Sequence, residues 1–237
     1  MVTLKNLAQA LCPSDQREQR GAATRAKLLA AAVTLFGEKG FKAVSVREIA
    51  DFAATNLAAI SYHFGDKSGL YKEAFMVPVQ ELLSATEQLR NAELDFEPFV
   101  RMLYQGFMMP FALDATRAKL MMKMHHREMV DPSGMLEIFI AESAKPLHDA
   151  MITQIHRVVD AAGLARGEPP DNAMQRLSFI MFGMATDFYS SSDYIQAFCP
   201  GTLTGQVAID ALVDSLVMSA CAIVQAEKAR RLSLVKL

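Results

Sequence analysis

The sequence predicts an all-α fold, and three observations support this prediction. Long stretches are rich in Ala, Leu, Met and Glu, which are strong helix formers. Apolar residues recur at helical spacing, as they do between Leu28 and Phe36. The 12 Gly and 9 Pro in 237 residues are too few for a loop-rich all-β fold. A hydrophobic share of 51% and a charged share of 21% indicate a folded chain rather than a disordered one.

The formal net charge of −2 conceals an asymmetry along the chain. From Asp15 to Lys72, nine Lys and Arg stand against six Asp and Glu, which gives +3. From Glu73 to the end, fourteen stand against twenty, which gives −6. A mildly basic first part on an acidic second part is typical of a small DNA-contacting module attached to a larger domain.

The cysteines Cys12, Cys199 and Cys221 are far apart and odd in number, so neither a disulfide framework nor a zinc cluster is predicted. No cofactor or metal is expected, and this cysteine usage fits a reducing cytoplasm. No window approaches roughly eighteen uninterrupted apolar residues, so no membrane span is expected. Polar residues interrupt Met1–Cys12, which favours an N-terminal arm rather than a lipoprotein signal.

Helix signals follow one another closely in the first seventy-five residues. A helix is expected over Thr24–Glu38, with Thr24 as its cap. The segment SVREIADFA begins with Ser45 and has Glu48 three residues later, which is a capping box for a short helix. A second short helix is expected over Leu57–Phe64. Two helices of about two turns with a short connection are the helix-turn-helix pattern.

The composition of the second short helix favours DNA binding over an ordinary helical bundle. Its inward positions, Ile60 and Phe64, are apolar. Its outward positions are small or hydrogen-bonding, and none carries a negative charge: Asn56, Leu57, Ala58, Ser61, Tyr62 and His63. Small residues let a helix enter the major groove, and hydroxyl, amide and imidazole groups can reach phosphates or base edges.

Residues 20–75 resemble the DNA-binding head of the TetR family of bacterial transcription regulators. The segments that carry the resemblance are AAVTLFGEKGF, SVREIA and ISYHFGDKSGLYKEAF. By this resemblance, backbone phosphates would be held by Ser45, Tyr62, His63 and Lys67. The bases would be faced by Thr55, Asn56, Leu57, Ala58 and Ser61, and Arg47 would add a groove or phosphate contact.

One departure from the family pattern lies in the turn. The family commonly has Gly-Val-Ser followed by a basic or polar residue, whereas this chain has Ala54-Thr55-Asn56-Leu57. Asn56 can still cap the helix. Leu57 cannot bond to a base but can pack against a thymine methyl group. We therefore expect an unchanged fold of the head and an altered operator preference.

The rest of the chain predicts long helices with short breaks. Its expected helices are Ser68–Leu89, Phe96–Leu113, Ala115–Val130, Leu136–Ala162, Asn172–Tyr189 and Thr204–Arg230. The expected organisation is an N-terminal arm (1–19), a three-helix DNA-binding domain with the helix-turn-helix (20–67) and, joined through a long helix, a helical ligand-binding and dimerisation bundle (68–237). The apolar stripe of the last helix is too broad to be covered by one neighbouring helix. The last two helices therefore suit a homodimer interface.

Met and Phe are concentrated in the body, where they form either bundle core or the lining of a cavity between helices. The resemblance favours a cavity for a small effector, and Pro110 favours a kink that opens space. The expected lining residues are Met102, Phe107, Met108, Phe111, Met122, His125, His126, Phe179, Phe182 and Met184.

The favoured function is a ligand-responsive transcriptional regulator. A repressor is expected, released from a palindromic operator on double-stranded DNA when a small apolar or amphipathic effector binds the body. Two alternatives stay open. One is a DNA-binding regulator without an effector. The other is a helical enzyme or metal protein that uses His125, His126 and Glu128, which otherwise form a polar or interface face. The enzyme is disfavoured because no catalytic motif accompanies these residues.

Overall fold

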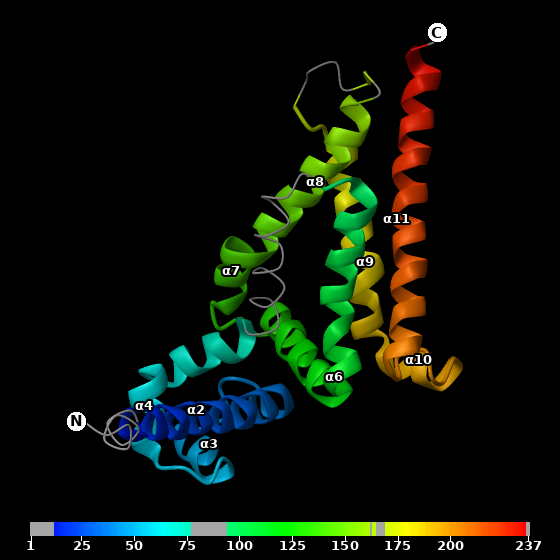
Figure 1. Cartoon of the computed structure of the whole chain (residues 1–237). Helices are drawn as coiled ribbons and strands as arrows, with labels where there is room; N and C mark the ends of the chain where they lie inside the picture. The colour runs from blue at the N-terminus through cyan, green and yellow to red at the C-terminus, as the bar shows by residue number, and fades with distance from the viewer. Residues whose placement is uncertain (1–11, 77–93, 162, 165–168, 236–237) are drawn as a thin grey trace, which may run out of the picture.

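The structure, a computed structural model, describes residues 12–76, 94–161, 163–164 and 169–235. Among these residues every regular element is a helix, so the prediction of an all-α fold is confirmed. Figure 1 shows the N-terminal helices forming a head at the lower left, with the body rising to the right and α11 along its outer edge.

The head contains four helical segments. They are α2 (Cys12–Lys39), α3 (Val46–Phe52), α4 (Leu57–Phe64) and a helix that occupies residues 67–76. The helix expected over Ser68–Leu89 is described only to residue 76, and its remainder lies outside the described residues. Phe36, Ile49, Ile60 and Leu70, one from each segment, are at most 2% exposed, so all four segments share one core.

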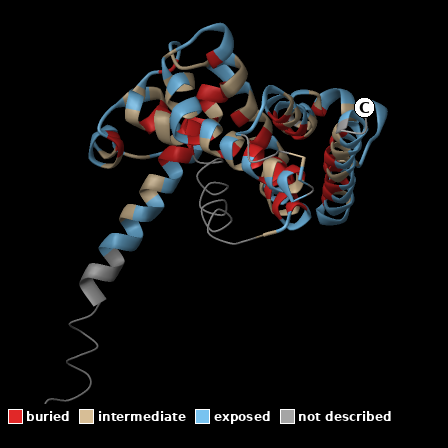
Figure 2. Cartoon of the chain, turned by 90° about the horizontal axis from the view of Figure 1, so that it is seen from above, coloured by how far each residue is buried: buried red, intermediate tan, exposed pale blue. Residues whose placement is uncertain are grey.

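Helix α2 begins well before the predicted start at Thr24. Residues 12–23 continue the helix, and residues 17–20 are exposed where it projects from the head (Figure 2). Thr24 is no cap, because its hydroxyl donates to the carbonyl of Arg20, one turn earlier in the same helix, at 2.9 Å. The preceding Arg, Gln and Glu residues are good helix formers, and they carry the helix past the expected boundary.

The described body is built from seven further elements. They are α6 (Phe96–Val130), α7 (Met135–Phe139), the π-helical turn η1 (Ile140–Ala144), α8 (Lys145–Asp160), α9 (Asn172–Ser190), α10 (Ser192–Phe198) and, as the last, α11 (Gln206–Val235). Helix α10 was not predicted. The others correspond to expected helices, with two differences in continuity.

The first difference is that the two helices expected on either side of Asp114 form one kinked helix, α6. Asp114 has non-helical torsion angles (φ −157°, ψ 89°), and its carboxylate accepts a hydrogen bond from the Arg117 amide at 3.0 Å. Asp114 thus acts as an internal N-cap for the second half. Pro110, four residues earlier, has no N–H to donate, which weakens the helix on the other side of the kink.

The second difference is that the helix expected over Leu136–Ala162 is interrupted by η1. The interruption lies directly before Pro146, which occupies the first turn of α8. Since proline cannot donate to the carbonyl four residues earlier, an uninterrupted α-helix would lose a hydrogen bond there. The π-helical turn accommodates that loss.

Two hydrophobic cores divide the molecule. The body core extends from Phe96 to Val224, and the head core from Leu28 to Met76 with Met121 and Met124 of α6 added. Residues 70–76, which the sequence assigned to the body, therefore pack in the head. The second half of α6 therefore contributes to the head core as well as to the body.

Helix α11 is the one described segment long and apolar enough to cross a membrane by length and composition. Such a helix is weak evidence for a membrane span, because core helices pass the same test. Leu212, Leu216 and Val217 are buried in the body core. Only 39% of its most apolar window is buried, however, so α11 carries more apolar surface than its own chain covers.

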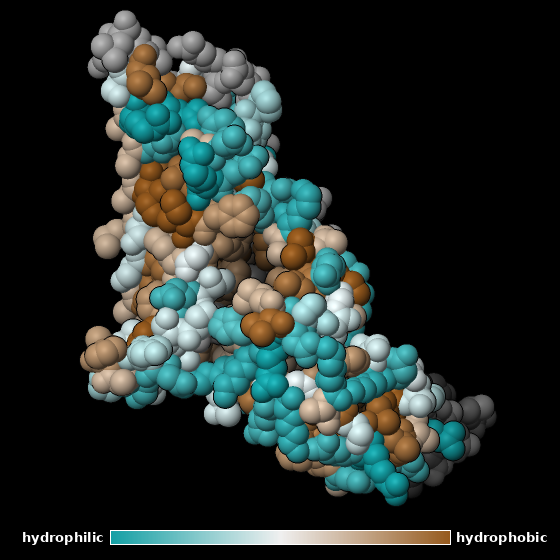
Figure 3. Space-filling model, turned by 180° about the vertical axis from the view of Figure 1, so that it is seen from behind, coloured by the Kyte–Doolittle hydropathy of each residue, from teal (hydrophilic) through white to brown (hydrophobic). Residues whose placement is uncertain are grey.

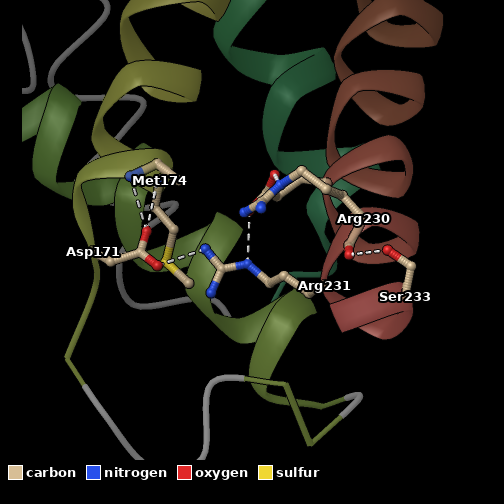
Figure 4. A network of polar contacts seen from close by, with 7 residues as sticks. Asp171, Met174, Arg230, Arg231 and Ser233 are labelled. Atoms are coloured by element: carbon tan, nitrogen blue, oxygen red, sulfur yellow. Dashed lines mark hydrogen bonds and ion pairs between the residues drawn. The ribbon is translucent and has the colours of Figure 1, made fainter. Parts of the chain in front are cut away.

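A polar network fastens the end of α11 to the start of α9 (Figure 4). The Asp171 carboxylate accepts from the backbone amides of Ala173 and Met174, both at 3.0 Å, and thereby caps α9. Arg231 donates to Asp171 and to Glu227, both at 2.7 Å. Arg230, Arg231's neighbour, donates to Glu227 through two nitrogens, each at 2.7 Å.

This network sets the charge state of both carboxyls. The guanidinium of Arg230, followed by that of Arg231, holds the pKa of the Glu227 carboxyl below its usual value. Burial acts to raise the pKa of Asp171, but the Met174 amide and the Arg231 guanidinium together lower it. Both groups are therefore ionised at neutral pH and stabilise the fold in that form.

Arg231→Ala should lower the free energy of unfolding by about 1–3 kcal/mol, because it leaves two ionised carboxylates short of a partner. Arg230→Ala is the matched control. Its side chain is 53% exposed against 13% for Arg231, so its loss should cost under about 1 kcal/mol.

The pH dependence of this difference follows from the lowered pKa values of Asp171 and Glu227. The stabilisation is present above the unfolded pKa of about 4 and disappears as the pH falls through the lower folded values. Urea unfolding of the two variants at pH 7 and pH 3 measures it. Equal destabilisation by both substitutions at pH 7 would refute this account of the network.

Candidate nucleic-acid interface

Side-chain caps fix the two short helices of the head. Ser45 accepts from the Glu48 amide at 3.1 Å at the start of α3, and its hydroxyl proton is left to donate elsewhere. Asn56 accepts from the Ala58 amide at 2.9 Å at the start of α4. Since that bond uses the Asn56 oxygen, only its amide nitrogen remains for a base or phosphate acceptor.

The connection between α3 and α4 is a helix-ending turn with alanine in the left-handed conformation. Ala54 has φ +50°, a conformation normally taken by glycine. Its amide bonds to the Asp51 carbonyl at 3.1 Å, and the Thr55 amide bonds to the Ala50 carbonyl at 2.9 Å, as in a Schellman motif. The turn therefore keeps the geometry that glycine would give, at a cost in strain.

Most residues predicted to face DNA lie together on the outer side of α4. Leu57 is 46% exposed and Tyr62 is 83% exposed, whereas Ile60 and Phe64 on the inner side are 2% and 8% exposed. Asn56, Ala58 and Ser61 are also exposed. His63 is partly buried, with its ring edge-on to that of Tyr62 at 4.8 Å. Ser45 and Arg47 are exposed at the start of α3.

Thr55 does not fit the expected base-facing set. Its hydroxyl oxygen is buried in the turn and has no hydrogen-bond partner among the described residues. In this structure the Thr55 hydroxyl is not presented to a base.

Lys67 lies at the start of helix 67–76, directly after the recognition helix α4. Its ammonium group sits 4.4 Å above the ring centroid of Phe41, and burial lowers its pKa. Asp66 caps the same helix by accepting from the Gly69 amide at 2.8 Å. A Cβ on Gly69 would lie 2.0 Å from the Phe64 carbonyl oxygen, so only glycine permits this sharp corner.

Helix 67–76 is held against the second half of α6 by a buried carboxylate. Glu128 is 2% exposed and accepts from the Tyr71 hydroxyl at 2.8 Å. It also accepts from the hydroxyl of Ser133 at 2.6 Å and from the Ser133 amide at 3.0 Å. Burial acts to raise the pKa of Glu128, yet the bonds from Ser133 and Tyr71 lower it. Burial in turn raises the pKa of the Tyr71 hydroxyl, so it stays protonated and able to donate.

Two further contacts join the head to α6. The Phe75 ring stacks on the His125 ring, with centroids 4.0 Å apart and planes 24° apart. The Arg127 guanidinium donates to the carbonyl of Glu38 at the end of α2, at 2.5 Å. Along the run His125–Glu128, read from the sequence as a polar or interface face of one helix, His125, Arg127 and Glu128 contact the head, whereas His126 contacts Ser190 of α9 in the body.

A cavity of about 360 Å³ lies on the body side of this contact. Its described lining comes from α6, α7 and α9: Gly106, Phe107, Pro110, Ala118, Met121, Met122, His125, His126, Met129, Leu136, Phe139, Thr186 and Ser190. Four of the predicted pocket residues are in this set, namely Phe107, Met122, His125 and His126.

The other predicted pocket residues lie elsewhere. Met108 and Phe111 are at most 3% exposed and belong to the body core. Phe179 is 68% exposed on α9. Met102, Phe182 and Met184 pack against the body core without lining this cavity. Among the missed α6 residues, Ala118, Met121 and Met129 share a helical stripe with Met122 and His125, a spacing that could have identified them.

His125 and Glu128 do not form a metal site. Glu128 is fully engaged by Tyr71 and Ser133, and His125 bonds through its Nδ1 to the Met121 carbonyl at 2.9 Å. Within the described ranges, no group of three or more His, Cys, Asp or Glu is arranged to hold a metal ion.

Two family models match the chain. Residues 28–74 match the bacterial regulatory proteins of the tetR family. Residues 92–223, more than half of the chain, match the C-terminal domain of the HTH-type transcriptional dual regulator CecR. The chain belongs to the TetR family of transcription regulators. Members of this family are DNA-binding transcription factors rather than enzymes, which excludes the enzyme alternative.

Curated relatives of this TetR family regulator match its head. YttP of Bacillus subtilis (strain 168), described as a probable HTH-type transcriptional regulator, is 53% identical over 47 residues, or 20% of this chain and 23% of YttP. CecR of Shigella flexneri is 48% identical over 52 residues, or 22% of this chain and 23% of CecR. The chain thus matches about a quarter of the length of these relatives.

Solved structures show the same fold at low sequence identity. A transcriptional regulator from Pseudomonas aeruginosa PAO1 has a TM-score of 0.64 and 16% identity, covering 90% of this chain and 92% of that one. The ketosteroid transcriptional regulator KstR2 of Mycobacterium tuberculosis has a TM-score of 0.55 and 17% identity, covering 83% and 92%. These similarities support the fold. They do not assign roles to the residues of the candidate interface.

Ala54→Gly should raise the free energy of unfolding by about 0.5–1 kcal/mol. The left-handed conformation costs alanine roughly 1–2 kcal/mol, which exceeds the extra chain entropy that glycine loses. Urea unfolding of the two proteins measures the difference. Gly69→Ala is the opposite control and should destabilise the head strongly. A loss of stability in Ala54→Gly would contradict the described turn.

Proposed function

We propose that this TetR family regulator is a ligand-responsive repressor. A homodimer binds a palindromic operator, and a small effector in the α6 cavity lowers its affinity for DNA. The observation that carries the proposal is the stack of Phe75 on His125 at 4.0 Å. His125 lines the cavity, and Phe75 belongs to the helix that directly follows the recognition helix. Filling the cavity would therefore act on the segment that positions α4.

The outer face of α4 suits the major groove of DNA. It is free of acidic residues, and its small side chains allow close approach. We assign phosphate contacts to Ser45, Tyr62, His63 and Lys67, with Arg47 near the groove edge. The bases would be met by Asn56, Leu57, Ala58 and Ser61. Among these, Leu57 is the apolar residue that fits a thymine methyl group.

Apolar surface on the body supports a dimer through α9 and α11. Phe179 and Ile180 on α9 are 68% and 51% exposed, and Val207 and Met218 on α11 are 85% and 69% exposed. Figure 3 shows apolar residues gathered on the body from behind. A second copy would cover this surface and set two recognition helices about one DNA turn apart, roughly 34 Å. Such a DNA-binding dimer would act in the cytoplasm.

The energetic requirement on the effector is modest. A coupling of about 1–3 kcal/mol between two sites changes affinity by about 5- to 150-fold. The contact between head and body contains one buried hydrogen bond from Tyr71 and one ring stack, each with a net value of about 1 kcal/mol. A ligand that disturbs either contact can therefore supply a coupling of that size.

Two other readings of the same fold make distinct predictions. The matched relative CecR is called a dual regulator, which favours a second candidate: repression of some promoters and activation of others. A regulator without an effector would bind the same DNA but respond to no compound. A reporter gene at each bound promoter distinguishes a dual regulator from a repressor. Melting-temperature shifts against a compound panel distinguish a regulator with an effector from one without.

The DNA upstream of the gene for this protein is the first operator to test. Tyr62→Phe and Lys67→Ala should each weaken binding about 5- to 50-fold, because each removes a group placed on a phosphate. Lys67→Ala should also reduce the slope of log affinity against log salt by about 1 per subunit, whereas Tyr62→Phe should leave the slope unchanged.

Fluorescence anisotropy over a salt series measures both quantities. Lys123→Ala, exposed on α6 and outside the proposed interface, is the control for an unspecific loss of positive charge. Wild-type protein without salt-sensitive affinity for any genomic fragment would refute the proposed DNA contacts. Equal effects of Lys67→Ala and Lys123→Ala would refute the role of Lys67.

A further inference from the structure

The described wall of the α6 cavity carries no formal charge. None of its residues is Asp, Glu, Lys or Arg, and most are Met, Phe or small apolar residues. An unpaired charge buried in such surroundings is strongly unfavourable. Methionine sulfur and aromatic rings make favourable contacts with an aromatic guest. The wall thus favours an uncharged molecule with an aromatic skeleton.

The hydroxyl protons on the α9 side are already engaged. Thr186 donates from its hydroxyl to the Phe182 carbonyl at 3.1 Å, and Ser190 donates to the Thr186 carbonyl at 3.3 Å. The Nε2 atom of His126 lies 3.2 Å from the Ser190 oxygen, so that imidazole is also paired through its distal nitrogen. The protons of both hydroxyls and the Nε2 atom of His126 are therefore already paired within the protein.

His125 differs from these groups because its distal nitrogen has no partner in the described part of the chain. Its Nδ1 lies 2.9 Å from the Met121 carbonyl oxygen. A carbonyl can only accept, so Nδ1 carries the proton. Burial lowers the pKa of His125, so the ring is neutral at neutral pH and Nε2 is a hydrogen-bond acceptor.

Aromatic neighbours hold this acceptor in place. Phe75 covers one face of the His125 ring at 4.0 Å, and Phe139 meets it in an edge-to-face arrangement at 4.9 Å. The bond to Met121 fixes rotation about the side chain. The wall therefore presents Nε2 of His125 as an acceptor held in a fixed position in mostly apolar surroundings, an arrangement that fixes ligand orientation.

We infer that the effector is a compact, uncharged aromatic molecule whose hydroxyl group donates a hydrogen bond to Nε2 of His125. This inference rests on the proposed effector role of the cavity. The cavity of about 360 Å³ is more than twice the roughly 150 Å³ of an apolar cavity that holds one benzene ring, so a two-ring skeleton fits. The hydroxyl of a bound ligand would contact the imidazole that stacks on Phe75, a residue of the head.

Four naphthalene compounds test the inference: naphthalene, 2-naphthol, 2-methoxynaphthalene and 2-naphthoate. They share a skeleton and differ in having no polar group, a donor, an acceptor only, or a charge. The protein has no Trp, so naphthyl fluorescence excited at the red edge of tyrosine absorption reports binding directly. The matched variant is His125→Phe, which keeps a flat ring against Phe75 and loses the acceptor.

Wild-type protein should bind 2-naphthol about 5- to 10-fold more tightly than 2-methoxynaphthalene, which corresponds to one hydrogen bond. The charged 2-naphthoate should bind most weakly. In His125→Phe the preference for 2-naphthol should disappear while naphthalene still binds. The comparison of compounds on wild-type protein stands even if the variant fails to fold.

The outcomes separate this inference from the proposed function. Equal binding of 2-naphthol and its methyl ether, or tightest binding of 2-naphthoate, would overturn the inference and leave the cavity as an effector site. Binding of none of the four would overturn the inference as well. Failure of the proposed function shows itself separately, as binding of 2-naphthol that leaves operator affinity unchanged.

Discussion

The buried carboxylate of Glu128 is the interaction on which the arrangement of head and body depends. A carboxylate that is 2% exposed must have its hydrogen bonds supplied by protein, and here Tyr71 supplies one and Ser133 two. Tyr71 belongs to the helix that follows the recognition helix, while Ser133 follows α6. Of these three bonds, the one from Tyr71 crosses from the head to the body, and the two from Ser133 hold the carboxylate in place to accept it. Removing the Tyr71 hydroxyl would leave a buried charge short of a hydrogen-bond partner. Breaking this bond is therefore costly, and it favours one position of the head on the body.

The kink at Asp114 gives α6 two roles. Its first half packs in the body core through Phe99, Leu103 and Met108, and its second half contributes Met121 and Met124 to the head core. The cavity spans both halves, from Gly106 and Pro110 before the kink to Met129 after it. A ligand there touches the two parts of one helix that belong to different cores. Under the proposed function, no long path between effector and DNA is needed, because the cavity wall and the anchor of the head are successive residues of α6.

Local sequence patterns predicted the head well because its structure is set by local interactions. The caps at Ser45 and Asn56 are formed as the sequence indicates, and the all-α fold and family follow from the same patterns. The sequence analysis missed features that depend on distant partners. Glu128 was read as part of a polar or interface face, but its partner could not be named, because Tyr71 lies 57 residues away. Met108 and Phe111 were assigned to the cavity because composition alone does not say which side of α6 is enclosed. The α6 stripe through Ala118, Met122 and His125 was visible in the spacing, but only the fold shows that α7 and α9 close over it.

A substitution that fills the cavity tests the central claim without any ligand. Ala118 lines the cavity from α6 and is 1% exposed, so Ala118→Leu would add methyl groups to the cavity wall to which His125 also belongs. The control is Ala150→Leu on α8, which lines a different hollow of the body. We predict that Ala118→Leu weakens operator binding about 10-fold, or about 1.4 kcal/mol, while Ala150→Leu leaves it unchanged. Both proteins should unfold cooperatively and remain dimeric. Operator affinity of a folded Ala118→Leu protein equal to that of the wild type would contradict coupling between this cavity and the DNA-binding head.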